Sequence, residues 1–187
     1  MALRNAILAA LLDGEASGYD LAKGFDASVA NFWMATPQQL YRELERMTTD
    51  GLIDTRVVLQ ERRPNKRLHS ITEAGYAALH EFAASDYKPP AIRDELMVRV
   101  QSMQTQDAPA VRAAVAEKRE WSVGKLARYE RLRTRLLAGR TEQAYLEEAE
   151  RVGPYLTLMR GISFEQENIR WAEFALAVID RRIVAQV

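Results

Sequence analysis

A helix-breaking stretch near the middle of the chain separates two segments with different patterns. Pro89 and Pro90 exclude a continuous helix here, because proline lacks the backbone N–H and clashes with the preceding turn. Before this point the apolar repeats are short and turn residues interrupt them, whereas after it they are long. We therefore predict two domains, at residues 1–86 and 91–187.

Two short amphipathic helices are predicted at the N-terminus. Apolar residues recur at helical spacing from Leu3 to Leu11, and an Asp-Gly pair then ends the pattern. Ser17 followed three positions later by Asp20 is a capping pattern, so we expect a second helix to begin there. This second helix is expected to run to about Val29.

A third helix carries start and stop signals at both ends. Thr36 suits the N-cap, Pro37 suits the first helical position, and Gln39 stands where a capping box needs Glu or Gln. Gly51 can adopt the left-handed conformation that ends a helix. The expected inner face consists of Leu40, Leu44 and Met47.

A hairpin is predicted after the third helix. Residues 55–60 are rich in β-branched side chains, residues 64–65 are a Pro-Asn turn pair, and residues 67–71 form the return strand. Thr72 then caps a fourth helix. Three short helices followed by a hairpin are the order of a winged helix-turn-helix, whose third helix enters the DNA major groove.

The segment after residue 91 is predicted to be all-helical, with helices at 92–104, at 109–137 and from 142 to the C-terminus. The last helix carries two apolar stripes. One contains Ile162, Ile169, Ala172, Leu176, Ile179 and Ile183, and the other Phe164, Trp171, Phe174 and Val178. Because apolar seams on two sides need partners on two sides, we expect a dimerisation bundle. The alternative is that both seams fold into one monomeric bundle. The fold class is thus mainly α, with a small β-hairpin wing.

The outward side of the third helix is polar and suited to reading bases. Opposite its apolar face stand Gln38, Arg42 and Glu45, flanked by Gln39 and Tyr41. Gln can bond both the N6 and N7 edges of adenine, and Arg can bond O6 and N7 of guanine. Taken alone, these residues are more typical of an ordinary solvated helix surface than of a DNA-reading face.

Positive charge is concentrated at the expected hairpin tip. Arg62, Arg63, Lys66 and Arg67 lie within six positions, where a wing would contact phosphate. The chain as a whole gives no such signal, because Lys plus Arg and Asp plus Glu both total 26. Residues 1–84 contain 9 basic and 11 acidic side chains, so the DNA-facing charge must be segregated. We expect acidic residues such as Asp13, Glu15 and Asp54 on the far side.

Several segments together resemble the PadR family of transcriptional regulators. The segments of the N-terminal part are Gly18-Tyr19-Asp20-Leu21, residues 36–44, Asp50-Gly51-Leu52-Ile53, residues 63–67 and Thr72-Glu73-Ala74-Gly75. Residues 156–179, with Arg160-Gly161-Ile162 and Trp171, resemble the C-terminal domain of the virulence-activator-like branch. One departure is His69, where the family commonly has Tyr.

The resemblance implies a homodimeric regulator that binds double-stranded DNA. Two recognition helices on two half-sites predict a near-palindromic operator. We expect repression, because a dimer bound over a promoter blocks polymerase. The expected DNA-binding residues are Thr36, Gln38, Gln39, Tyr41, Arg42, Arg62, Arg63, Asn65, Lys66 and Arg67. The expected dimerisation residues are Leu156, Ile162, Ile169, Trp171, Leu176 and Ile179. The alternative is a helical protein-interaction adaptor without specific DNA binding.

Composition argues against catalysis and metal binding. The chain has no cysteine, only His69 and His80 as histidines, and no phosphate-binding glycine loop. We expect no enzyme activity, no metal and no cofactor, although a small-molecule effector stays open. The aromatic side chains that would line an effector cavity are Trp121, Tyr129, Trp171 and Phe174. The absence of cysteine agrees with a reducing compartment, so we expect a cytoplasmic protein. Charges interrupt every apolar run, so we expect no membrane contact.

Overall fold

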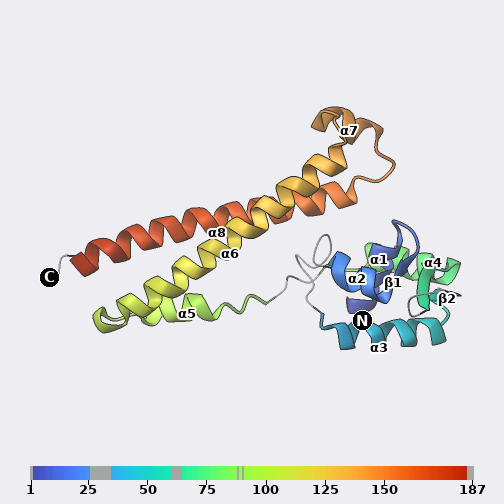
Figure 1. The fold of residues 1–187 in the computed structure, drawn as a ribbon, viewed down its shortest axis with the longest axis horizontal. Helices are drawn as coiled ribbons and strands as arrows, with labels where there is room; N and C mark the ends of the chain where they lie inside the picture. The colour runs from blue at the N-terminus through green and yellow to red at the C-terminus, as the bar shows by residue number, and fades with distance from the viewer. Residues whose placement is uncertain (1, 26–34, 60–64, 88, 90, 185–187) are drawn as a thin grey trace. The chain divides into compact units, whose positions relative to one another are not determined.

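The computed structural model describes residues 2–25, 35–59, 65–87, 89 and 91–184. The chain divides into two compact units, Met1–Lys88 and Pro89–Val187. Figure 1 shows short helices and a small sheet in the N-terminal unit, and long helices in the C-terminal unit. Each unit is therefore described by itself.

The N-terminal unit surrounds a single apolar core. Its helices are α1 (Ala2–Leu11), α2 (Gly18–Phe25), α3 (Pro37–Thr49) and α4 (Glu73–Ala84). The buried core residues are Ile7, Leu8, Leu11, Leu21, Leu40, Leu44, Met47 and Ile53. The inner face predicted for the third helix is confirmed by this core. The predicted end of the second helix, near Val29, lies outside the described residues.

Three strands of the N-terminal unit, within the described part of the chain, form an antiparallel sheet in the order β1-β3-β2. They are β1 (Ala16–Ser17), β2 (Ile53–Val58) and β3 (Lys66–Ile71). The β2–β3 hairpin was predicted, whereas β1 was not, because two residues are too few to show alternation. In the register of the sheet, His69 of β3 pairs with Thr55 on one side and Ala16 on the other.

Local hydrogen bonds define both ends of α3. Thr36 accepts from the backbone N–H of Gln39, and the Gln39 side chain accepts from that of Thr36, which is a complete capping box. At the other end Gly51 has φ +70°, and the N–H of Leu52 bonds to the carbonyl of Met47. These bonds confirm the predicted start and stop signals.

The C-terminal unit consists of α5 (Glu95–Ser102), the short 3-10 helix η1 (Thr105–Asp107), α6 (Ala108–Leu137), α7 (Glu142–Glu148) and α8 (Gly153–Val184). The prediction of one continuous helix from residue 142 to the end is wrong, because α7 ends before α8 begins. Pro154 explains the interruption: it has no N–H to donate to the preceding turn and is tolerated only in the first turn of a new helix.

Helices α6 and α8 lie side by side and share two separate apolar clusters (Figure 1). One cluster includes Val115, Ala172 and Ile179, and the other includes Tyr129 and Ile162. Polar residues are buried on the same pair of helices, namely Ser122 and Glu165. Lys125 Nζ lies 3.5 Å from Glu165 Oε1, and the side-chain amide of Asn168 donates to Glu165 Oε2.

The architecture confirms the predicted fold class, a mainly α chain with a winged helix-turn-helix at the N-terminus and a helical C-terminal unit. Among the residues that the structure describes, no helix combines the length and apolarity that crossing a bilayer requires.

Candidate nucleic-acid interface

The outer face of α3 presents several polar side chains to solvent. Gln38, Arg42, Glu45 and Thr49 are exposed, opposite the buried apolar residues of the same helix. An amide, a guanidinium and a carboxylate on one helical face supply both donors and acceptors. This set can form bidentate hydrogen bonds with base edges in a major groove.

Two predicted DNA-binding residues also form the N-cap of α3. Thr36 Oγ1 accepts from the Gln39 N–H at 3.2 Å, and Gln39 Oε1 accepts from the Thr36 N–H at 2.9 Å. The carbonyl end of the Gln39 side chain is therefore occupied, and its NH₂ group is the part that can serve a partner. Gln38, by contrast, has no role in the capping box.

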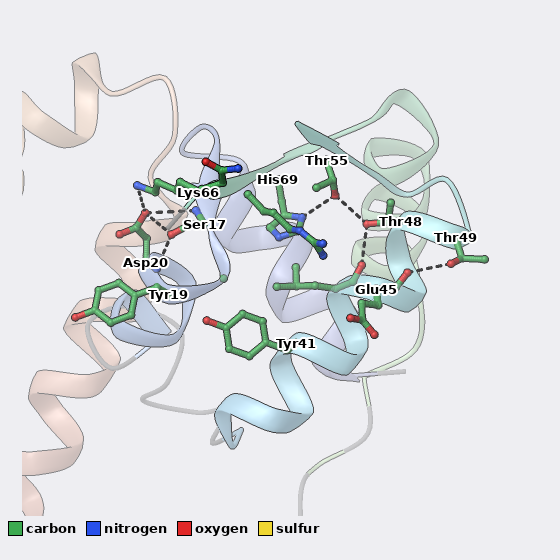
Figure 2. Close-up of a pocket in the computed structure, with 14 residues that line it drawn as sticks. Ser17, Tyr19, Asp20, Tyr41, Glu45, Thr48, Thr49, Thr55, Lys66 and His69 are labelled. Atoms are coloured by element: carbon green, nitrogen blue, oxygen red, sulfur yellow. Dashed lines mark hydrogen bonds and ion pairs between the residues drawn. The ribbon is translucent and has the colours of Figure 1, made fainter. Parts of the chain in front are cut away.

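Tyr41 packs against the start of α2. A Cβ atom at residue 18 would lie 2.4 Å from Cε1 of Tyr41, so the two helices approach this closely only because residue 18 is glycine. The Tyr41 side chain remains about half exposed, and Figure 2 shows its hydroxyl pointing toward Tyr19. The Gly-Tyr-Asp-Leu segment thus positions a side chain of α3.

The wing is joined to α2 by an ion pair close to the turn of the hairpin, where Lys66 pairs with Val58. Lys66 Nζ lies 2.8 Å from Asp20 Oδ2, and Asp20 also accepts from the hydroxyl of Ser17. The bond from Lys66, and next the bond from Ser17, lower the pKa of Asp20. The ammonium group of Lys66 is therefore paired with a carboxylate. Asn65 and Arg67, on either side of it in the sequence, are exposed. Arg62 and Arg63 lie outside the described residues.

His69 connects the wing to α3 through two threonines. Its Nδ1 lies 2.9 Å from Thr55 Oγ1, which lies 3.1 Å from Thr48 Oγ1, and Thr48 donates to the carbonyl of Leu44. The His69 side chain is buried. Burial, and secondly the charge of Arg67, lower the pKa of His69, so the ring is neutral near pH 7.

These elements surround one open cavity of about 810 Å³ (Figure 2). Its lining comes from the start of α2, the wing-facing side of α3, and strands β2 and β3. The lining residues are Ser17, Gly18, Tyr19, Asp20, Tyr41, Leu44, Glu45, Thr48, Thr49, Thr55, Asn65, Lys66, Arg67 and His69. Of the predicted DNA-binding residues, the cavity brings together Tyr41, Asn65, Lys66 and Arg67, whereas Thr36, Gln38, Gln39 and Arg42 do not line it.

Negative charge is less segregated than expected. Asp20 and Glu45 line the same cavity as the predicted DNA-binding residues. Glu15, which we expected on the far side, forms an ion pair with Arg56 of β2. Among the described residues, no group of histidines and carboxylates is arranged to hold a metal ion.

Sequence reasoning missed several residues that line the cavity. Tyr19 stands next to Gly18 in a segment that carries the family resemblance, so a signal was present. Thr48, Thr55 and His69 gave no local signal, because their contacts join residues that are 7 and 14 positions apart.

Comparison with known proteins identifies the family. Residues 7–81 match the model of the transcriptional regulator PadR-like family, and residues 92–180 match the virulence activator alpha C-terminal model. A probable transcriptional regulator of Mycobacterium tuberculosis is 33% identical over 97% of this chain and 100% of its own length. The chain belongs to the PadR-like family of transcriptional regulators.

Solved structures of PadR-like proteins share the whole fold. PadR of Bacillus subtilis, solved in complex with operator DNA, superimposes with a TM-score of 0.75 at 27% identity, covering 95% of this chain and 97% of that chain. The virulence activator AphA of Vibrio cholerae gives a TM-score of 0.67 at 33% identity, covering 96% and 98%. Bacillus subtilis PadR is itself described as a negative transcriptional regulator.

The residues expected to dimerise this PadR-like chain differ in exposure. Ile162 and Ile179 lie in the apolar clusters between α6 and α8, so they are already covered within one protomer. Ile169, Trp171 and Leu176 are partly buried, the last two against one of these clusters. Leu156 is 57% exposed and is available to a second copy.

Some large apolar side chains elsewhere in the C-terminal unit are more exposed than most of the predicted dimerisation residues. Trp121 is 62% exposed on α6, and Phe174 is 67% exposed on α8. Tyr129, by contrast, is buried and Trp171 partly buried. The four aromatic side chains considered for an effector cavity thus have very different exposures.

Proposed function

We propose that the protein is a homodimer that binds double-stranded DNA sequence-specifically and represses transcription from a near-palindromic operator. The observation that carries this proposal is that the wing-facing side of α3, with Tyr41, lies around one cavity with the wing residues Asn65, Lys66 and Arg67. Binding of operator DNA by Bacillus subtilis PadR supports it. The site of action would be the bacterial cytoplasm, where the DNA is.

Base recognition is assigned to the exposed face of α3. Gln38 suits adenine, Arg42 suits guanine, and the Glu45 carboxylate can accept from N4 of cytosine. Glu45 also repels phosphate, so it weakens contacts that lack a matching base. This carboxylate therefore adds to specificity at some cost in total affinity.

Backbone contact is assigned to the wing, the N-cap of α3 and the nearby hydroxyl of Tyr41. Asn65 and Arg67 are exposed close to the turn of the wing, and Arg62 and Arg63 complete the basic tip in the sequence. Such contacts set the orientation of the protein on the duplex and make affinity depend on salt. Lys66 contributes less, because it is shared with Asp20.

Dimerisation is assigned to the exposed apolar side chains of the C-terminal unit, with Leu156, Trp121 and Phe174 at the contact. Two copies would present two α3 helices to half-sites about 34–36 Å apart, or a multiple of that distance. A dimer bound over a promoter blocks polymerase without any further contact surface. The description of Bacillus subtilis PadR as a negative regulator favours repression.

The test is a titration of labelled duplexes from the protein's own promoter region at several salt concentrations. Arg42→Ala should weaken operator binding by about 1–3 kcal/mol and leave random DNA unaffected. Arg63→Ala should weaken all sequences alike and reduce the salt slope by about 1. Arg170→Ala, at an exposed arginine of α8, is the matched control and should change neither.

Three outcomes would contradict the proposal. Equal losses for Arg42→Ala and Arg63→Ala on random DNA would remove the division between base and backbone contacts. A footprint with a single half-site would contradict the symmetric operator. A monomer without salt-sensitive affinity for any duplex would favour the alternative, a protein-interaction adaptor.

A further inference from the structure

A continuous chain of hydrogen bonds joins β3 to β2 and then to α3. It runs from His69 Nδ1 to Thr55 Oγ1 (2.9 Å), to Thr48 Oγ1 (3.1 Å) and to the Leu44 carbonyl (2.9 Å). Figure 2 shows these side chains in line across the cavity. We call His69, Thr55 and Thr48 the wing–helix relay.

The direction of every bond in the relay follows from its last acceptor. The carbonyl of Leu44 can only accept a hydrogen bond, so the Thr48 hydroxyl donates its single hydrogen to it. In its contact with Thr55, Thr48 must then be the acceptor, so the Thr55 hydroxyl donates to Thr48. Thr55 has no second hydrogen to donate, so it must accept from His69. His69 therefore carries a proton on Nδ1.

The surroundings of His69 keep this arrangement neutral. The side chain is 7% exposed, and burial together with Arg67 lowers its pKa. The other titratable groups that line the cavity around it are Tyr19, Asp20, Tyr41, Glu45, Lys66 and Arg67. At neutral pH the relay thus consists of uncharged hydrogen bonds from the Nδ1–H tautomer.

We propose that His69 is a positioning residue for DNA recognition, which through Thr55 and Thr48 holds the base of the wing against the C-terminal half of α3. The inference rests on the proposed function, in which wing and α3 contact one duplex together. A wing that moves independently of α3 would have to be ordered on binding. The entropy cost of this ordering reduces the affinity for the matched DNA site.

The first test compares two amides at position 69. In His69→Asn the amide nitrogen is bonded to Cγ, as Nδ1 is in histidine, so it can donate to Thr55. In His69→Gln the amide nitrogen is bonded to Cδ, so it lies one bond further from the backbone than Nδ1 does. We expect His69→Gln to lose about fivefold in the ratio of operator to random-DNA affinity, the effect of one hydrogen bond. His69→Asn should retain the ratio, and the salt slope should be unchanged in both.

A double-mutant cycle provides the second test. Thr48→Val removes the hydroxyl at the α3 end and should lower the same ratio by about fivefold. If the relay acts as a unit, Thr48→Val with His69→Gln should lose no more than either change alone. Additive losses would overturn the relay, as would equal ratios for Asn and Gln at position 69.

The third test is spectroscopic and needs no DNA. Nitrogen-15 NMR of the His69 ring at neutral pH should show the proton on Nδ1, in the full chain. A proton on Nε2 would overturn the inference whatever the binding data show. Failure of the unmodified protein to bind any duplex would instead overturn the proposed function and this role with it. Normal binding with unaffected relay variants would overturn the role of His69 alone.

Discussion

The two units of this PadR-like protein are stabilised in different ways. The N-terminal unit has one apolar core to which α1, α2, α3 and β2 all contribute, and its helix ends are closed by capping bonds. The C-terminal unit relies on α6 and α8, which share two smaller clusters and leave large side chains such as Trp121 and Phe174 exposed.

This difference indicates a division of labour. Several elements packed around one core give the N-terminal unit a defined surface, which the proposed recognition of base edges needs. Two long helices bury only one stripe each, so apolar area stays exposed, and this is where we propose that a second copy binds. Matched changes in both units test that division.

The largest expected effect is on assembly. Phe174→Glu places a charge on the exposed apolar face of α8 and should weaken the dimer by about 2–4 kcal/mol, the range of interface hot spots. Sedimentation equilibrium measures the change. Leu59→Glu, at an 80% exposed side chain of the N-terminal unit, should leave the oligomeric state unchanged. A dimer unaffected by Phe174→Glu would place the interface elsewhere.

A glycine pair contrasts the packing of the two units. A Cβ atom at Gly75 of α4 would lie 2.2 Å from the Leu52 carbonyl oxygen, so Gly75→Ala should destabilise by about 3 kcal/mol. At Gly124 of α6 a Cβ atom meets nothing within 4 Å, and Gly124→Ala should stabilise by up to about 1 kcal/mol. Urea unfolding of both variants measures these changes in the free energy of unfolding. Destabilisation by Gly124→Ala would reveal close packing of α6 in the dimer.

A threonine pair separates stability from recognition. Thr36 caps α3 and Thr141 caps α7, each accepting from the backbone N–H three residues on. Replacement by Ala should cost about 1 kcal/mol of unfolding free energy at either site. Only Thr36→Ala should also weaken operator binding, and Thr36→Ser should restore it. Equal binding losses at both sites would mean that general stability, rather than the placement of α3, sets the affinity.

The smallest effect concerns two carboxylates with lowered pKa values. Lys66 first, then Ser17, lowers the pKa of Asp20, and Arg112 lowers that of Asp180. Because each folded-state pKa lies below the unfolded value, the stabilisation is present above about pH 4 and lost as pH falls through the folded-state pKa. Asp20→Asn and Asp180→Asn should each remove a small part of this acid dependence, measured by unfolding between pH 2 and 6.

DNA binding distinguishes the same two variants. Asp20→Asn removes a negative charge from the cavity and frees Lys66, so binding to all duplexes should tighten and the salt slope should steepen by about 1. Asp180→Asn should leave both unchanged. An unchanged slope for Asp20→Asn would mean that Lys66 does not contact phosphate.

The sequence by itself determined the family, the fold class and most helix ends of the N-terminal unit. The capping signals at Ser17, Thr36 and Thr72, and the turn at Gly51, were readable because each acts between residues three to five positions apart. The outward polar face of α3 followed from the same short-range periodicity.

Tertiary structure alone decided which apolar residues of α8 lie inside and which lie outside. Both predicted stripes have helical spacing, and only packing against α6 buries Ile162 and Ile179 while leaving Phe174 exposed. It also brought β1 beside β3, and Gly18 against Tyr41. The wing–helix relay joins separate elements in the same way. Contacts of this kind depend on how whole elements pack against each other, and the local sequence pattern does not determine that packing.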